Sequence, residues 1–274
     1  ARSIDFLETR DPERPFFLWT SFSDPHPPYE CDPRFWQLYD GMDLPEAVIG
    51  DWSADSDAIP AVLRSATLRL NRVDRFSAQQ IRQARRAYYA CISQIDDHLG
   101  RLWGQLQHQR LLDSTWIIFT SDHGDMLGDH HLGAKTIYQE GAAHIPFLIR
   151  PPQGVLEAQR GQRCPELICL ADILPTVLHA CGLADRVPAA IDGEDVTPLM
   201  SGGGNARSRA GAPQQDRRYR SGGERLRRHV AMAGRCDLLL QQQYWQLPRG
   251  EINDGAWHHV LITRICRSST TTSR

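Results

Sequence analysis

A long stretch of apolar residues at helical spacing, flanked by two short apolar runs, constrains this chain most strongly. From Ser77 to Gln109 an apolar side chain recurs every three or four residues, which predicts one long helix with a single buried stripe. Ser77 is a suitable N-cap residue. The flanking runs, residues 15–22 and 115–120, are rich in aromatic and β-branched residues, as is typical of buried strands. The stripe comprises Ile81, Ala84, Tyr88, Cys91, Ile95, Leu99, Leu102 and Leu106.

Further elements continue this alternation of strands and helices. Residues 144–149 form another strand pattern, which Pro151-Pro152 should end, and 168–170 form a shorter one. A helix is expected from about Asp172 to Cys181, with Gly182 ending it, and residues 1–7 have the spacing of a helix already under way. The order predicts an α/β fold over residues 1–202, with a largely parallel central sheet flanked by helices.

The composition changes after about residue 202. Gly202-Gly203-Gly204 leads into a segment with nine arginines between Asn205 and Arg235 against two acidic residues. Few apolar residues interrupt it, so 203–274 is expected to be an irregular basic tail, disordered or translated out of frame. A nucleic-acid-binding arm is not favoured, because aromatic residues do not alternate with the arginines.

Composition excludes several classes of protein. The net charge of −2 gives no overall field toward nucleic acid or an anionic membrane. An apolar run of about 18 residues, as a transmembrane helix needs, does not occur in the sequence. The seven cysteines include no C-x-x-C pair, which argues against a structural zinc site. The sequence starts at Ala1 without an initiator Met, a basic n-region or an apolar h-region, so the natural protein is expected to begin earlier. The compartment is left unassigned, because a targeting peptide would lie in that earlier part.

Polar residues that could do chemistry follow two of the predicted strands. Asp122-His123 comes directly after residues 115–120, and a carboxylate beside an imidazole can bind a divalent cation. Lys135 lies in a Gly-containing loop, where its charge could pair with an oxyanion. His26 is framed by prolines and could protonate a leaving group. The residues alone leave the alternatives open: a capped turn, a solvated lysine and a loop histidine.

Five blocks in this order together resemble the sulfatase family of the alkaline phosphatase superfamily. The most diagnostic is STWIIFTSDHGDMLGDHHLGAKTIYQEGAAHIP at residues 114–146, which is similar to the family's S-D-H-G-x-x-x-G-D-H block and its following G-K and I-P. The others are PFFLWTSFSDPHPPY at 15–29, YACISQIDDHLGRL at 89–102, D-I-L-P-T at 172–176 and D-G at 192–193. The resemblance covers about residues 1–202 and implies an alkaline phosphatase-like fold, incomplete here.

The resemblance also implies roles for individual residues. Asp122 and His123 are expected to bind a divalent metal ion, Ca²⁺ by family likeness, with Mn²⁺ or another transition metal allowed by the imidazole. Lys135 is expected to contact the sulfuryl or phosphoryl oxygens, and His26 to contact substrate and protonate the leaving group. His130, in Gly128-Asp129-His130, is expected to line the same pocket.

The family's nucleophile has no counterpart in this sequence. It is a formylglycine made within C/S-x-P-S-R, accompanied by two acidic metal ligands, and is expected in a missing N-terminal segment. Cys31-Asp32-Pro33-Arg34 is similar only in part, because the serine before the arginine is absent. The expected substrate is a small sulfate ester. The alternatives are a phosphonate monoester or phosphodiester hydrolase of the same superfamily, or a catalytically inactive fragment.

Overall fold

The computed structural model describes three long ranges of the chain and three separate strands beyond residue 202. The expected elements are present: α1 (Arg2–Thr9), β1 (Phe16–Ser21), α4 (Ala78–His108), β2 (Thr115–Ser121), β3 (Phe147–Arg150), β5 (Ile168–Cys169) and α6 (Ile173–Ala180). The remaining helices and strands are α2 (Pro33–Gln37), α5 (Glu140–Ala143), β4 (Arg163–Cys164), α7 (Thr197–Met200), β6 (Ala233–Gly234), β7 (Leu238–Leu239) and β8 (His258–Arg264). Described residues are 2–49, 71–135, 139–201, 233–234, 238–239 and 258–264.

The helix predicted from residue 77 begins where its capping residue places it. The Ser77 hydroxyl accepts from the Gln80 N–H at 3.2 Å, and the Gln80 side chain accepts from the Ser77 N–H at 2.9 Å. This reciprocal pair is a capping box, which satisfies two backbone donors that a helix start leaves unpaired. The prediction of one long helix is therefore confirmed.

The sheet has a mixed strand order, β1-β8-β2-β3-β7-β4. The α/β architecture is confirmed, but the strand directions differ from the largely parallel arrangement expected from the sequence. β8 lies between β1 and β2 and pairs antiparallel with both, so the two strands joined by α4 share a direction without pairing to each other. β3 also returns antiparallel to β2, because a loop with the short helix α5 joins them instead of a long crossover helix.

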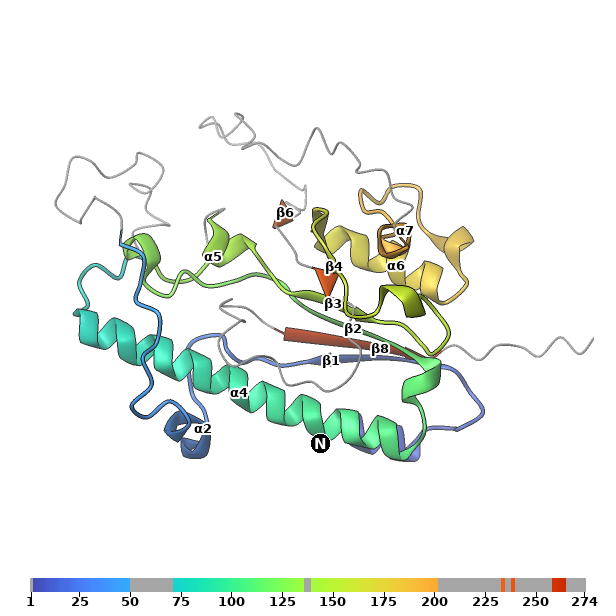
Figure 1. Ribbon diagram of the computed structural model, residues 1–274, viewed down its shortest axis with the longest axis horizontal. Helices are drawn as coiled ribbons and strands as arrows, with labels where there is room; N and C mark the ends of the chain where they lie inside the picture. Colours follow the sequence, from blue (N-terminus) through green and yellow to red (C-terminus); the bar gives the residue numbers. More distant parts are fainter. Residues whose placement is uncertain are drawn as a thin grey trace, which may run out of the picture.

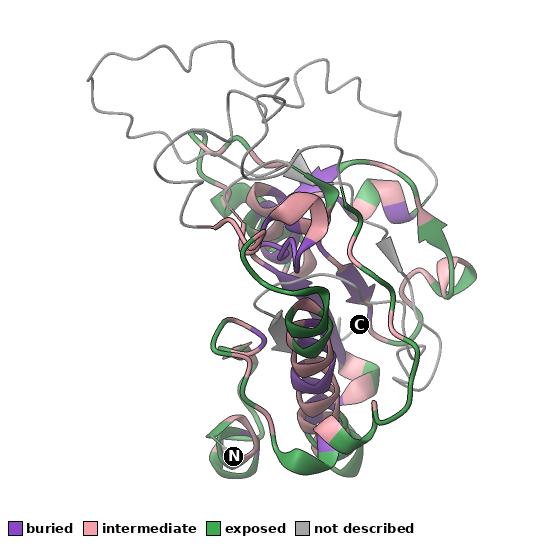
Figure 2. Ribbon diagram, turned by 90° about the vertical axis from the view of Figure 1, so that its left-hand side faces the viewer, coloured by how far each residue is buried: buried purple, intermediate pink, exposed green. Residues whose placement is uncertain are grey.

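Two apolar cores cover opposite faces of the sheet. Figure 1 shows α4 below the strands and α6 with α7 above them. Alternate residues of β2 enter different cores: Ile117 and Phe119 pack with α4, whereas Trp116 and Ile118 pack with the α6 side. Every residue of β2 is buried, as expected for a strand covered on both faces. Figure 2 shows the buried stretches in α4 and in the strands behind it.

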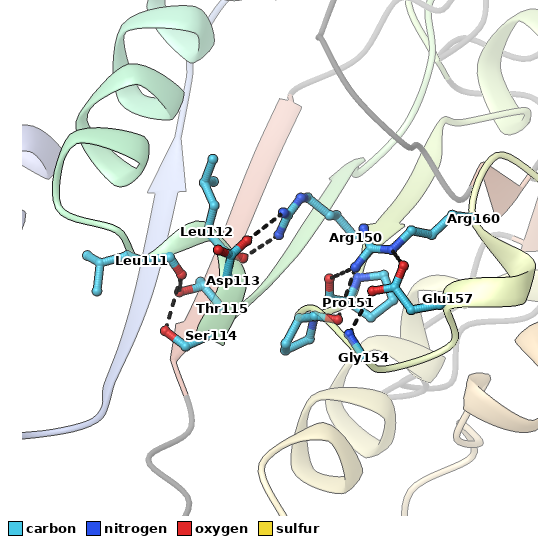
Figure 3. A network of polar contacts seen from close by, with 11 residues as sticks. Leu111, Leu112, Asp113, Ser114, Thr115, Arg150, Pro151, Gly154, Glu157 and Arg160 are labelled. Atoms are coloured by element: carbon cyan, nitrogen blue, oxygen red, sulfur yellow. Dashed lines mark hydrogen bonds and ion pairs between the residues drawn. The ribbon is translucent and has the colours of Figure 1, made fainter.

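A polar network holds the start of β2 against the end of β3 (Figure 3). Arg150 donates to the carbonyl of Leu112 and lies 4.0 Å from the Asp113 carboxylate. Arg160 donates to the carbonyls of Pro151 and Pro152 at 3.1 and 3.0 Å, so the two prolines that end β3 also anchor the next loop. Burial lowers the pKa of Arg150, and the neighbouring Arg160 acts in the same direction.

The D-I-L-P-T and D-G blocks serve to hold the chain together at the start of α6. The fully buried Asp172 carboxylate accepts from the N–H groups of Cys169 and Glu194 at 2.7 and 2.8 Å. The Thr176 hydroxyl accepts from the Val196 N–H. A Cβ at Gly193 would lie 1.9 Å from the carbonyl oxygen of Ala171, so only glycine fits there.

The tail beyond residue 202 falls mostly outside the described residues, and the division at 202 stays a prediction. The described strands in that range, β6, β7 and β8, pair with the sheets. Residues 50–70, between α2 and α4, also lie outside the described residues. Among the described helices, none combines the length and the apolar character needed to span a membrane.

Candidate metal and oxyanion site

The candidate site is built on the turn that follows β2. Asp122 and His123 follow the carboxyl end of the strand, and the chain then packs closely against α5. The Gly124 N–H donates to the Ala142 carbonyl at 2.7 Å, and a Cβ at Gly124 would lie 2.0 Å from the carbonyl oxygen of Gly141. Glycine is therefore required here, because it lets the turn approach α5 this closely.

The His123 ring is oriented by its own turn. Its Nδ1 lies 2.9 Å from the Gly124 carbonyl oxygen, and its Nε2 lies 3.5 Å from Oδ2 of Asp122. A carbonyl accepts only from a protonated nitrogen, so Nδ1 carries the proton and Nε2 presents its lone pair toward the carboxylate. The residue is 8% exposed, and burial lowers the pKa of the imidazole, with the Lys135 charge adding to this effect. A neutral imidazole is the form that binds metal ions.

Asp125 joins this turn to the segment that carries Lys135. Its Oδ1 accepts from the N–H groups of Leu127 and Ala134, both at 2.9 Å. The second bond crosses the loop and fixes the backbone next to Lys135, whose charge acts on His123. Burial raises the pKa of the Asp125 carboxyl, and the hydrogen bonds from Leu127, Tyr29 and Ala134 oppose that shift.

The loop that carries His26 is held on α4 and reaches the same carboxylate. The Tyr29 hydroxyl donates to Oδ2 of Asp125 at 3.1 Å. Its ring packs edge-on against Tyr88 of α4, with ring centroids 5.6 Å apart. Gln94, also on α4, donates to the Asp24 carboxylate at 3.2 Å. His26 itself is half-buried, and its Nδ1 lies 2.9 Å from the Pro27 carbonyl oxygen.

His130 is placed differently from the other predicted residues. It has a left-handed backbone (φ 52°), and its N–H donates to the Val48 carbonyl at 2.7 Å. The preceding Asp129 accepts from the Val48 N–H and from the buried Arg85 of α4. These bonds tie residue 130 to the segment before residue 49, whereas Asp125 ties the Lys135 segment and the His26 loop to the turn after β2.

The donor set suits part of a metal site. Asp122 offers a carboxylate whose side chain is 41% exposed, and the Nε2 of His123 faces it. Within the described ranges, no three His, Cys, Asp or Glu side chains lie close enough together to hold an ion by themselves. These two residues fit a divalent cation as two of its ligands, and further ligands have to come from elsewhere.

The contact between Asp125 and Tyr29 was not predicted from the sequence. Both lie inside recognised blocks, at S-D-H-G-D and P-H-P-P-Y. An acidic residue one position after a turn glycine was an available signal. Its pairing with a tyrosine 96 positions earlier was not, because side-chain partners that distant depend on the fold.

Comparison with known proteins supports the resemblance to sulfatases. The sulfatase family profile matches residues 1–183. An arylsulfatase of Clostridium perfringens (strain 13 / Type A) is 36% identical over 72% of this chain and 40% of its own length. A choline-sulfatase of Rhizobium meliloti (strain 1021) is 32% identical over 69% of this chain and 36% of its own. The multifunctional alkaline phosphatase superfamily protein PehA of Trinickia caryophylli is 32% identical over 74% and 40%.

A solved structure shares the fold. It is that of BT4656 in complex with its substrate D-glucosamine-2-N,6-O-disulfate, with a TM-score of 0.52 and 21% identity, covering 74% of this chain and 51% of that one. The chain thus spans at most 40% of the length of these curated relatives. With the family profile matching two thirds of its residues, the chain belongs to the sulfatase family.

Proposed function

We propose that this chain supplies part of the active site of a sulfate-ester hydrolase. The observation that carries the proposal is the turn after β2, where the Nε2 of His123 and the Asp122 carboxylate face each other at 3.5 Å. The Lys135 charge acts on the same imidazole. A bound cation would therefore face the Asp122 carboxylate, and a bound anionic group would face the lysine. The family membership and the arylsulfatase and choline-sulfatase relatives support sulfate esters as the substrate class.

The metal proposed for this turn is Ca²⁺, by family likeness, with Mn²⁺ or another transition metal as the alternative that an imidazole ligand favours. Such an ion supplies Lewis-acid stabilisation of charge on the oxygens of the transferring group. Asp122 and His123 would hold it. The protonated Nδ1 of His123, fixed on the Gly124 carbonyl, sets the tautomer that makes Nε2 a ligand.

Three other residues act on the substrate in this proposal. Lys135 offsets negative charge on the sulfuryl oxygens as a point charge. His26 contacts the ester and gives a proton to the departing alkoxide oxygen, and the contact of its Nδ1 with the Pro27 carbonyl sets the ring orientation. His130 is proposed to contact the substrate from the neighbouring segment, since its backbone is bonded to Val48 and not to Asp125.

The nucleophile proposed for the intact enzyme is a formylglycine from a C/S-x-P-S-R motif. That pattern is absent from residues 1–274, as is the family's pair of acidic metal ligands. The turn after β2 therefore accounts for metal and oxyanion binding, and the attacking group would come from sequence outside this chain.

A second candidate is hydrolysis of phosphonate monoesters or phosphodiesters on the same scaffold. It is favoured by the imidazole of His123 as the second candidate ligand, and by the likeness to the multifunctional PehA. A third reading of the chain, as an inactive fragment, predicts no turnover on any ester.

An activity assay on protein expressed with its upstream coding sequence separates these functions. We expect hydrolysis of 4-nitrophenyl sulfate to exceed that of 4-nitrophenyl phenylphosphonate in kcat/KM. Replacing Asp122 with alanine should lower kcat/KM by about 10³-fold, since a metal ion supplies several kcal/mol of charge stabilisation. Asp113→Ala, at the other end of β2, is the matched control and should leave turnover unchanged. Wild-type turnover by the Asp122 variant would contradict the metal assignment.

A further inference from the structure

One buried carboxylate contacts all three segments of the proposed site. Asp125 is 5% exposed and sits two residues after His123 in the metal-binding turn. Its Oδ1 accepts from the N–H of Ala134, next to Lys135, and its Oδ2 accepts from the hydroxyl of Tyr29, three residues after His26. The same Oδ1 closes its own turn through the Leu127 N–H.

The tyrosine that meets this carboxylate is itself held in place from the other side. Burial raises the pKa of the Tyr29 phenol far above its ordinary value, so the hydroxyl stays protonated and acts as a donor. Its ring packs on Tyr88, which is fully buried in α4. Two further α4 residues hold the same loop: Cys91 donates to the Glu30 carbonyl and Gln94 to Asp24. Tyr88, Cys91 and Gln94 are three positions apart, so they share one helix face.

We infer that Asp125 and Tyr29 are positioning residues that lock the His26 loop, the Asp122–His123 turn and the Lys135 segment into one arrangement. Neither residue needs to touch substrate for this role. One carboxylate oxygen accepts from the two backbone donors, and the other accepts from the phenol. Because one side chain makes both contacts, breaking the bond to one oxygen should also loosen the segment that is bonded to the other oxygen. The inference rests on the proposed function in one respect only, because that function names what the three segments bind.

The first test needs no metal and uses amide hydrogen exchange on the 274-residue chain. Tyr29→Phe removes one hydroxyl and keeps the ring on Tyr88. We expect exchange at the amides of Leu127 and Ala134 to become about tenfold faster, as the loss of one charge-assisted hydrogen bond of about 1.4 kcal/mol implies. Asp125→Asn should speed exchange across residues 23–31. In the double variant the Tyr29 change should add nothing at Leu127 and Ala134.

Tyr39→Phe is the matched control. The Tyr39 hydroxyl lies 2.7 Å from Ser93 Oγ, on the same helix, so this change removes one phenol hydrogen bond of α4 outside the site. It should leave exchange at Leu127 and Ala134 at the wild-type rate. Equal exchange at those amides in the two tyrosine variants would overturn the inference, as would additive effects in the double variant.

The second test distinguishes this inference from the proposed function. Calorimetric titration with Ca²⁺ and with Mn²⁺ uses protein expressed with its upstream coding sequence, which would supply the remaining metal ligands. The Kd should be about tenfold weaker in Tyr29→Phe than in wild type or Tyr39→Phe, the usual effect of losing an outer contact of a metal site. Binding of neither ion by this wild-type protein would overturn the proposed metal pair, whereas the exchange result tests the positioning role independently. Binding in wild type with equal Kd in both tyrosine variants would overturn the positioning role.

Discussion

At the scale of single residues, the turn after β2 depends on a glycine that no residue with a side chain could replace without a clash. Gly124 brings the backbone within reach of α5, where its N–H donates to Ala142 at 2.7 Å. The block S-D-H-G-D made Asp122 and His123 recognisable as candidate ligands. It could not show that the following Asp125 would be buried and bonded to three donors, because those donors come from the fold.

We predict that Gly124→Ala destabilises the protein by at least about 2 kcal/mol, because the added methyl meets the backbone of Gly141, which cannot move aside as a side chain could. Gly100→Ala is the matched control. Its Cβ would meet nothing within 4 Å on α4, so this change should stabilise by about 0.5–1 kcal/mol through helix propensity. Urea unfolding of both variants measures the difference, and equal midpoints would refute the close-approach argument.

At the scale of elements, α4 was the most predictable part of the fold, and it supports several other parts. Its apolar stripe and its capping box are local patterns, and the helix begins at Ala78 as expected. The same helix packs on the sheet and holds the His26 loop. The position of β8 was not predictable, because its two partner strands are more than a hundred residues earlier in the chain. A ladder between such distant segments leaves no local signal in either one.

A carboxyl group on α4 should make stability depend on pH. Burial raises the pKa of Asp96 to about 6, with the neighbouring Asp97 adding to the shift, and its Oδ1 has no hydrogen-bond partner among the described residues. The folded state therefore binds this proton more tightly than the unfolded state, whose pKa is about 3.9. The stabilising protonated form is present below about pH 4 and is lost as pH rises to about 6.

We accordingly predict that Asp96→Asn is more stable than wild type at pH 7.5, by on the order of 1 kcal/mol after discounting for solvent screening. The difference should shrink as pH falls from 6 to 4. Asp97→Asn is the control, since that carboxylate is more exposed and pairs with Arg34 at 3.3 Å. Urea unfolding at several pH values measures both. A constant difference from pH 4 to pH 8 would show that Asp96 ionises normally in the folded protein.

At the scale of the whole molecule, one sheet is shared by two cores. Adjacent residues of β2 point into different cores. If β2 separated from one core, its residues in the other core would therefore become exposed as well. The aromatic and β-branched run at 115–120 predicted a strand, and the fold shows that both of its faces are buried. The sequence could not predict that the buried Asp172 would fasten the α6 layer to the chain beyond it, because its two donors lie on either side of that helix.

Sharing a sheet should make the two cores unfold in one step while their mutational effects add. Leu106 of α4 and Ile149 of β3 are each 1% exposed and belong to different cores. We predict about 3 kcal/mol of destabilisation for Leu106→Ala and about 1 kcal/mol for Ile149→Val. The double variant should lose the sum within about 0.5 kcal/mol, because the two side chains belong to different cores. Circular dichroism and tryptophan fluorescence should report one common urea transition for every variant. Separate transitions for the two probes in Leu106→Ala would mean that the α6 layer keeps its core without α4, and that the sheet does not couple them.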